Sequence, residues 1–213
     1  TDNHTGIAGI NWKARIMPIK VFQASGRGDV ATITKGIIYA SHKGATVINM
    51  SFGSTARSLA MEDALANAYQ QSILVAAAGN EGIDIESRFP PGRFYPAALS
   101  FVLGVTAPDG EFSNTDKNGP VFSTYPELSN YEIKAPGTTI LSTVPNGNYR
   151  QYQGTSMAAP IVSGIVSLYR TLRPTESQEL LFGNLINSTN TFVDIQKALT
   201  LTPLPQLNIV TYQ

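Results

Sequence analysis

SILVAAAGNEG, at residues 72–82, is an apolar run that stops abruptly at a Gly-Asn-Glu-Gly segment. The nearly continuous apolar stretch 72–78 predicts a strand that is covered on both faces. Open α/β sheets carry their sites at the carboxyl ends of parallel strands, which is where Asn80 would lie. The stretch therefore predicts a buried parallel strand that leads into a functional edge.

The segments on either side alternate between strand and helix. Further strands are predicted at RIMPIKVF (15–22), ATVINMSF (45–52) and SFVLGVTA (100–107), and helices at 29–42 and at about 58–70. Asp29 stands at the N-cap of the first helix, and Gly44 comes just beyond its end. This βαβ succession predicts an α/β fold with right-handed crossovers. We expect a three-layer sandwich with a mostly parallel sheet.

The second half of the chain has a different pattern. Residues 108–153 are rich in Gly, Pro, Ser, Asn and Tyr and predict long loops with short strands. SMAAPIVSGIVSLYRTL (156–172) predicts a largely buried helix, and a second helix follows at about 175–187 with Thr175 as a possible cap. We expect the domain to cover residues 1–199, with 200–213 as a linker or the start of an extension.

Composition excludes several classes of function. The 213 residues are 42% hydrophobic and 14% charged, which is typical of a globular domain. Lys+Arg and Asp+Glu are both 15, so no basic run predicts a nucleic-acid partner. The chain has no cysteine, which excludes disulfides and thiolate chemistry. No apolar stretch is long enough to predict a membrane span or a membrane partner.

GTSMAAP, at residues 154–160, places a serine at the start of an apolar helix. The free N–H groups and positive potential of a helix N-terminus favour an oxyanion that forms beside Ser156. Gly154 leaves room for a substrate backbone. The structural alternative is that Thr155 or Ser156 simply caps a core helix.

Two other strand ends carry polar residues. Asn80 could direct its side-chain N–H₂ at a developing oxyanion, or could be a turn asparagine between two glycines. VINMSFGS (47–54) is again a strand that runs into a Ser-Gly loop. Each of the three motifs is weak by itself.

Taken in their order along the chain, the three motifs resemble the subtilase family, in which N-M-S-x-G precedes A-A-G-N, which precedes G-T-S-M-A-x-P. Four further segments resemble the family in the same order: GIAGINWKARIMPIKVF (6–22), FYPAALSFVLGVTAP (94–108), APGTTILSTVP (135–145) and VDIQKAL (193–199). The resemblance implies a secreted, extracellular serine endopeptidase that acts on extended polypeptides. It implies Ser156 as the nucleophile, and Asn80 with the Ser156 N–H as the oxyanion hole. Met157 matches an oxidisable methionine.

The resemblance also implies a set of substrate-binding residues. One segment would bind the substrate backbone and wall the pocket for P1, the residue before the scissile bond: Ser51, Phe52 and Gly53. A second would bind the backbone from the other side: Gly26, Arg27 and Gly28. The opposite P1 wall would be Ala77, Ala78 and Gly79, with Glu81 at the rim, and the P4 pocket would be Val30, Ile33 and Phe52. These walls favour apolar or aromatic side chains at P1 and P4.

The histidines depart from the family pattern. The family's chain order is Asp, then His, then Ser, but this chain has only His4 and His42. HTGIAG loosely resembles the family's H-G-T-H-V-A-G, yet the spacing places Asn3 at the position of the catalytic histidine. We therefore expect the general base and its orienter in a segment before Thr1, present in the longer protein or as a separate chain. The chain alone would be almost inactive.

The same register aligns residues 1–7 with the family's structural calcium loop. The implied ligands are the carbonyl oxygens of Thr1, Thr5 and Ile7 and the side-chain oxygen of Asn3, an oxygen set that suits Ca²⁺. The remaining ligands would belong to the segment before Thr1.

Two other functions stay open at this stage. Gly26-x-Gly28-x-x-Ala31 follows a predicted strand, as in dinucleotide-binding proteins, but the expected acidic residue at the end of the next strand is missing. The second alternative is a non-catalytic module that binds extended peptides, although binding alone needs neither Ser156 nor Asn80.

Overall fold

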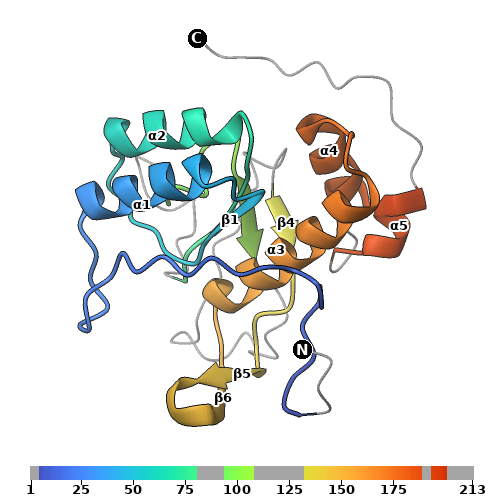
Figure 1. The fold of residues 1–213 in the computed structure, drawn as a ribbon, viewed down its shortest axis with the longest axis horizontal. Coiled ribbons are helices and arrows are strands. Elements are labelled where there is room, and N and C mark those ends of the chain that lie inside the picture. Colours follow the sequence, from blue (N-terminus) through green and yellow to red (C-terminus); the bar gives the residue numbers. More distant parts are fainter. Residues whose placement is uncertain (1–4, 81–93, 108–131, 189–192, 201–213) are drawn as a thin grey trace, which may run out of the picture.

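A parallel sheet forms the middle of the molecule (Figure 1). The computed structural model describes residues 5–80, 94–107, 132–188 and 193–200. The sheet contains β1 (Val47–Met50), β2 (Ile73–Ala77), β3 (Leu103–Thr106) and β4 (Glu132–Lys134), hydrogen-bonded in that order. Val47 pairs with Ile73, and every ladder in the sheet is parallel. All carboxyl ends of the strands therefore meet at one edge.

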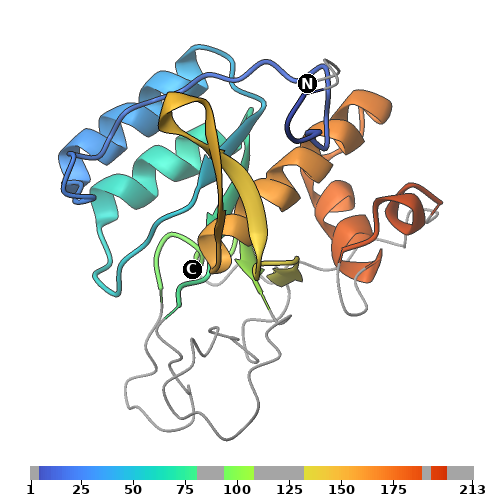
Figure 2. The ribbon, with the colours of Figure 1, turned by 90° about the horizontal axis from the view of Figure 1, so that it is seen from below.

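Helices cover both faces of the sheet (Figure 2). α1 (Val30–His42) and α2 (Leu59–Tyr69) lie on one face, and α3 (Thr155–Leu172), α4 (Gln178–Ser188) and α5 (Ile195–Thr200) lie on the other. A hairpin of β5 (Ile140–Val144) and β6 (Asn148–Tyr152), joined by the short helix η1 (Pro145–Gly147), projects from the sandwich (Figure 1). The predicted three-layer α/β fold is confirmed.

Two apolar clusters fill the space between the layers. One joins Val75, Leu103 and Ile133 to α3, α4 and α5, and the other joins Leu74 and Ala76 to α1 and α2. All residues of β2 and β3 are buried, which explains their unbroken apolar sequence. α3 buries one face rather than its whole circumference.

The observed helix caps agree only partly with the caps predicted from the sequence. Asp29 caps α1 as predicted: its Oδ1 accepts the Thr32 N–H at 2.8 Å, a hydrogen bond that lowers the pKa of the carboxyl. The predicted Thr175 cap is wrong, because Thr175 lies in a turn and α4 begins three residues later. Ser177 caps that helix, with its Oγ accepting the Leu180 N–H at 3.3 Å.

The strand predicted at 15–22 does not form among the described residues. This segment is extended but pairs with no strand of the sheet. It runs along α1, where Val21 and Ile19 contact Gly36. Ile16 is 84% exposed and Met17 is 42% exposed. An apolar pattern can predict an extended backbone, but a strand also needs a neighbour with which to share hydrogen bonds.

No helix within the described ranges combines the length and the apolar character that a bilayer span requires.

Candidate active site

Ser156 and Asn80 both lie at the carboxyl edge of the sheet. β1 ends at Met50 and leads into Ser51, while β2 ends at Ala77 and leads into Asn80. α3 begins against these two strand ends, with half-buried Ser156 as its second residue. The Ser156 hydroxyl donates to the Ser51 carbonyl oxygen at 3.3 Å. The edge therefore combines two strand ends with one helix N-terminus.

Thr155 connects Asn80 to the start of α3. The Asn80 side-chain oxygen accepts the Thr155 N–H at 2.9 Å and the Thr155 hydroxyl at 3.1 Å. Thr155 is fully buried, and its hydroxyl oxygen also accepts the Gly79 N–H at 3.2 Å. These contacts fix the oxygen end of the Asn80 carboxamide and so also fix the position of its amide nitrogen. The sequence analysis did not predict this role of Thr155.

Gly154 allows the carboxamide to approach the helix. Its φ of +126° is a conformation that residues with a Cβ rarely adopt. A Cβ at this position would also lie 3.1 Å from both the oxygen and the nitrogen of the Asn80 side chain. Glycine is therefore required twice, once for the backbone and once for the contact with Asn80.

Pro160 explains how Ser51 is bonded to α3. In an α-helix the N–H of residue 160 would donate to the carbonyl of residue 156, but proline has no N–H. The Ser156 carbonyl oxygen accepts the Ser51 hydroxyl at 2.9 Å instead. The proline of the SMAAP motif thus frees a carbonyl that binds the strand end.

Asn49 extends this contact into a chain of polar side chains. Its Nδ2 donates to the Ser51 oxygen at 3.0 Å, and its Oδ1 accepts the Ser163 hydroxyl at 3.0 Å. Ser163 lies on α3 two turns beyond Ser156. β1 and α3 are therefore joined at two levels, although Asn49 itself is exposed.

An apolar group lies beside Phe52. The Phe52 ring meets the Phe22 ring edge-on, with centroids 5.2 Å apart. Ile33, which is 8% exposed, belongs to the cluster against which both rings pack. Val30, at the start of α1, is 45% exposed. Phe22 thus joins the residues predicted for the P4 site, an addition that the sequence analysis missed because the contact is with a distant part of the chain.

The segment Gly26-Arg27-Gly28 forms a turn followed by extended backbone. Gly26 has a φ of +77°, and the Gln23 N–H donates to the Arg27 carbonyl at 2.9 Å. A Cβ on Gly28 would lie 2.8 Å from the Phe22 ring. The Asp29 carboxylate caps the helix that follows, which disfavours a phosphate at that N-terminus. The geometry therefore does not favour the dinucleotide alternative.

The residues predicted for the opposite wall of the P1 pocket have small side chains and are buried. Ala77, Ala78 and Gly79 are all buried, and the Ala78 N–H donates to the Val105 carbonyl at 3.0 Å. Glu81, predicted at the rim of this wall, lies outside the described residues.

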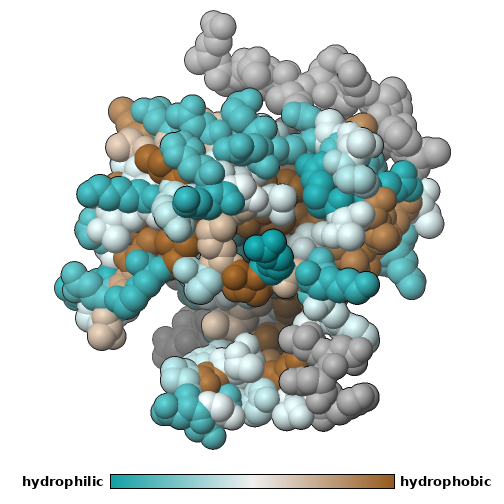
Figure 3. Space-filling view, viewed as in Figure 1, coloured by the Kyte–Doolittle hydropathy of each residue, from teal (hydrophilic) through white to brown (hydrophobic). Residues whose placement is uncertain are grey.

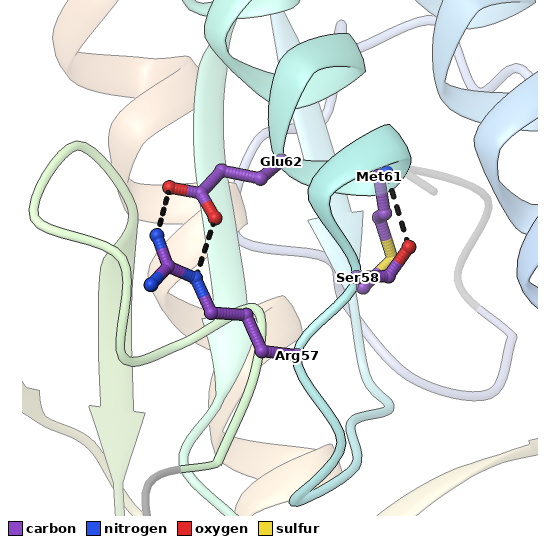
Figure 4. Close-up of polar contacts among 4 residues, drawn as sticks. All are labelled: Arg57, Ser58, Met61 and Glu62. Carbon is purple, nitrogen blue, oxygen red and sulfur yellow. Dashed lines mark hydrogen bonds and ion pairs between the residues drawn. The ribbon is translucent and has the colours of Figure 1, made fainter.

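Two contacts anchor the far end of the loop that carries Ser51–Gly53 (Figure 4). The Arg57 guanidinium binds both carboxylate oxygens of Glu62 at 2.8 Å, and the Ser58 hydroxyl oxygen accepts the Met61 N–H at 3.4 Å. The hydrogen bond with Arg57 lowers the pKa of Glu62. The loop therefore joins α2 through a capped and charge-paired turn.

Of the two histidines, only His42 lies within the described residues, and it lies away from this edge. His42 ends α1, just before the amino end of β1 and hence at the opposite edge of the sheet. His4, Thr1 and Asn3 lie outside the described residues. Thr5 and Ile7 lie next to Gly6, which packs against the Tyr149 ring of β6.

Two carbonyl groups do not make a calcium site by themselves, so the described residues do not test the predicted loop. Within the described ranges, no group of three or more His, Cys, Asp or Glu side chains could hold a metal.

Comparisons with known proteins show the family to which this chain belongs. The model of the subtilase family of peptidases matches residues 1–202. Subtilisin DY of Bacillus licheniformis is 38% identical over 191 residues, which is 89% of this chain and 66% of that protein. Thermitase of Thermoactinomyces vulgaris is 38% identical over 169 residues, which is 79% of this chain and 56% of that protein. The chain thus spans less than two thirds of these relatives.

Solved structures show the same fold. The self-cleaved protease domain of PatA superposes with a TM-score of 0.76 at 29% identity, covering 93% of this chain and 78% of that one. Because the family model matches nearly the whole sequence, the chain belongs to the subtilase family.

Proposed function

We propose that this chain carries the nucleophile of a serine endopeptidase, with Ser156 forming the acyl-enzyme. The observation that carries the proposal is the meeting of Ser156 and Asn80 at the start of α3, linked through Thr155. A purely structural helix cap would not require an amide side chain pinned by two hydrogen bonds beside a serine.

The proposed reaction uses groups that the chain already positions. The Ser156 oxygen attacks the scissile carbonyl carbon while its proton passes to a base, and the carbonyl electrons move to the oxygen. The Ser156 N–H, at the start of α3, and the Asn80 amide nitrogen would donate to this oxyanion. Collapse of the intermediate expels the amine with the transferred proton and leaves the acyl-enzyme. Water then releases the acyl group.

A partner segment would supply the base and its orienting carboxylate. Among the described residues β1 pairs only with β2, so its other edge is open. Large apolar side chains are exposed along the neighbouring N-terminal segment, at Ile10, Trp12, Ile16 and Met17. Figure 3 shows apolar surface in the middle of the face that this segment crosses. We infer that the partner adds a strand to β1 and covers these side chains.

Reconstitution tests the proposal. The chain is mixed with a segment that carries an Asp and a His, or is expressed as the C-terminal part of a longer chain that contains them. We expect a fluorophosphonate probe to label Ser156 only in the complemented form, and Ser156→Ala to abolish labelling. Efficient labelling of the chain alone would contradict the need for a partner. Absence of labelling in a complex that binds peptide would favour the non-catalytic binding module.

Two further expectations remain proposals. An extracellular site of action is supported by family membership and is tested by fractionation of a producing culture. Calcium at residues 1–7 is tested by a calcium-dependent rise in the melting temperature of the complemented protein, which Asn3→Ala should reduce.

A further inference from the structure

Phe94 bridges the two segments that are predicted to wall the P1 site. Its side chain is 9% exposed and packs against Ala78, which is fully buried. A Cβ on Gly53 would lie 2.5 Å from Cδ1 of the Phe94 ring. The ring therefore rests on the backbone of Gly53 and on the methyl group of Ala78 at the same time.

The backbone fixes the ring in this position. The Ser54 N–H donates to the Tyr95 carbonyl at 2.9 Å, and the Tyr95 N–H donates to the Ser54 carbonyl at 2.8 Å. This antiparallel bridge holds the residue after Phe94 to the residue after Gly53. These two bonds hold the backbone next to Phe94 beside the backbone next to Gly53. While they are intact, the ring can leave the space between the two walls only by rotation of its own side chain.

A simple core role does not account for this placement. Among the described residues, Phe94 belongs to neither of the two clusters that fill the space between the layers, and forms a separate small cluster with Ala78. Gly53 and Ala78 are small, so without the ring the space between them would be open to a substrate side chain.

We propose that Phe94 fills the P1 site and restricts cleavage to peptides with a small P1 residue, such as glycine, alanine or serine. The proposal rests on the endopeptidase function proposed above. It narrows the expectation of an apolar or aromatic P1 residue, because it disfavours large P1 side chains. Because close-packed groups resist even one added methylene, a large P1 side chain would have to displace a ring held on two sides.

Hydrolysis of acyl-Ala-Ala-Pro-X p-nitroanilides by the complemented enzyme tests the proposal. We expect the wild type to prefer alanine over phenylalanine at X by about tenfold or more in kcat/KM. Phe94→Ala should shift this ratio about 10–100-fold toward phenylalanine. Leu99→Ala is the matched control, because Leu99 lies in the same segment and is 8% exposed but packs in the cluster beneath α1 and α2. Its P1 ratio should not change.

A binding measurement separates this inference from the proposed catalysis. The Ser156→Ala chain is titrated with acyl-Ala-Ala-Pro-Ala and acyl-Ala-Ala-Pro-Phe carboxylates, with and without Phe94→Ala. The same preference and the same shift would support the role of Phe94 even if the complemented enzyme hydrolysed nothing. A wild type that prefers phenylalanine would overturn the inference and leave the endopeptidase function intact. A P1 ratio in Phe94→Ala equal to that in Leu99→Ala would also overturn the inference. If Phe94→Ala does not fold, Phe94→Leu gives the same comparison.

Discussion

The sheet has a closed flank, at β2 and β3, and an open flank, at β1, and the two differ in how much of their surface is buried. On the β2–β3 flank every strand residue is buried and α3 closes the layer, whereas on the β1 flank Asn49 is exposed and Ile16 is 84% exposed. The groups that would recognise a substrate and stabilise an oxyanion are fixed by contacts within the chain. Under the proposed function, a partner beside the open flank would supply the groups that move the proton.

The largest expected effect lies on the closed flank. Phe182 is 1% exposed and packs in the cluster beneath α3, with its ring 6.3 Å from that of Tyr69. Phe182→Ala should lower the free energy of unfolding by about 3–5 kcal/mol, because the cavity cannot collapse between packed layers. Urea denaturation measures the loss.

Ile16→Ala is the matched change on the open flank. In the chain alone it should alter stability by less than about 0.5 kcal/mol. In the complemented protein it should weaken partner affinity about 10-fold, because the proposed partner would bury this side chain. A large stability loss in the chain alone would show that the open flank is already complete.

Asn80→Ala should have the next largest effect, and should affect catalysis more than folding. Loss of one oxyanion donor should lower kcat of the complemented enzyme by about 10²–10³-fold with a small change in KM. Thr155→Ser is the matched control, since it keeps the hydroxyl and the N–H that hold the Asn80 oxygen. A change in KM alone would mean that Asn80 binds substrate but not the transition state.

The sequence predicted those parts of the fold that depend on local pattern. β2 and β3 are buried on both faces and therefore read as unbroken apolar runs. The segment 15–22 has a similar pattern but no strand partner, and strand formation depends on a partner that its own sequence does not encode. Thr175 and Ser177 are both acceptable caps, so the choice between them depended on the turn before α4.

The candidate site could be predicted where its residues follow strand ends or open a helix, as Ser156 and Asn80 do. The role of Pro160 could also have been inferred, because a proline four residues after Ser156 always leaves that carbonyl without its helical donor. Phe22 and Phe94 could not, because their roles arise from contacts with Phe52, Gly53 and Ala78, which are distant in the sequence.

Ser51→Ala tests the link between the two flanks. It removes the hydroxyl that donates to the Ser156 carbonyl oxygen. This oxygen has no helical donor because residue 160 is proline. The unpaired oxygen should cost about 1–3 kcal/mol in the free energy of unfolding, and kcat should fall as Ser156 loses its fixed position. Pro160→Ala in the Ser51→Ala background supplies the helical N–H and should recover part of the stability. Failure of that rescue would show that the carbonyl does not depend on Ser51.

Glu62→Gln should have the smallest effect and should depend on pH. Arg57 lowers the pKa of Glu62, so the pair stabilises the fold fully above the unfolded pKa of about 4.3 and loses this stabilisation as the pH falls through the folded value. Near neutral pH the variant should melt about 1–2 °C below the wild type, because the Arg57 side chain is 53% exposed and the pair is screened.

The two melting curves should converge as the pH falls through the lowered pKa of Glu62 in the folded protein, where the wild-type carboxyl also becomes neutral. High salt should narrow the neutral-pH difference for the same electrostatic reason. Asp63→Asn removes the same charge from the next residue of α2 without touching the bidentate pair, so its difference from the wild type should be smaller. A Glu62→Gln difference that persisted unchanged in acid would mean that the carboxylate acts through shape and hydrogen bonding, and that its charge contributes nothing to fixing the loop.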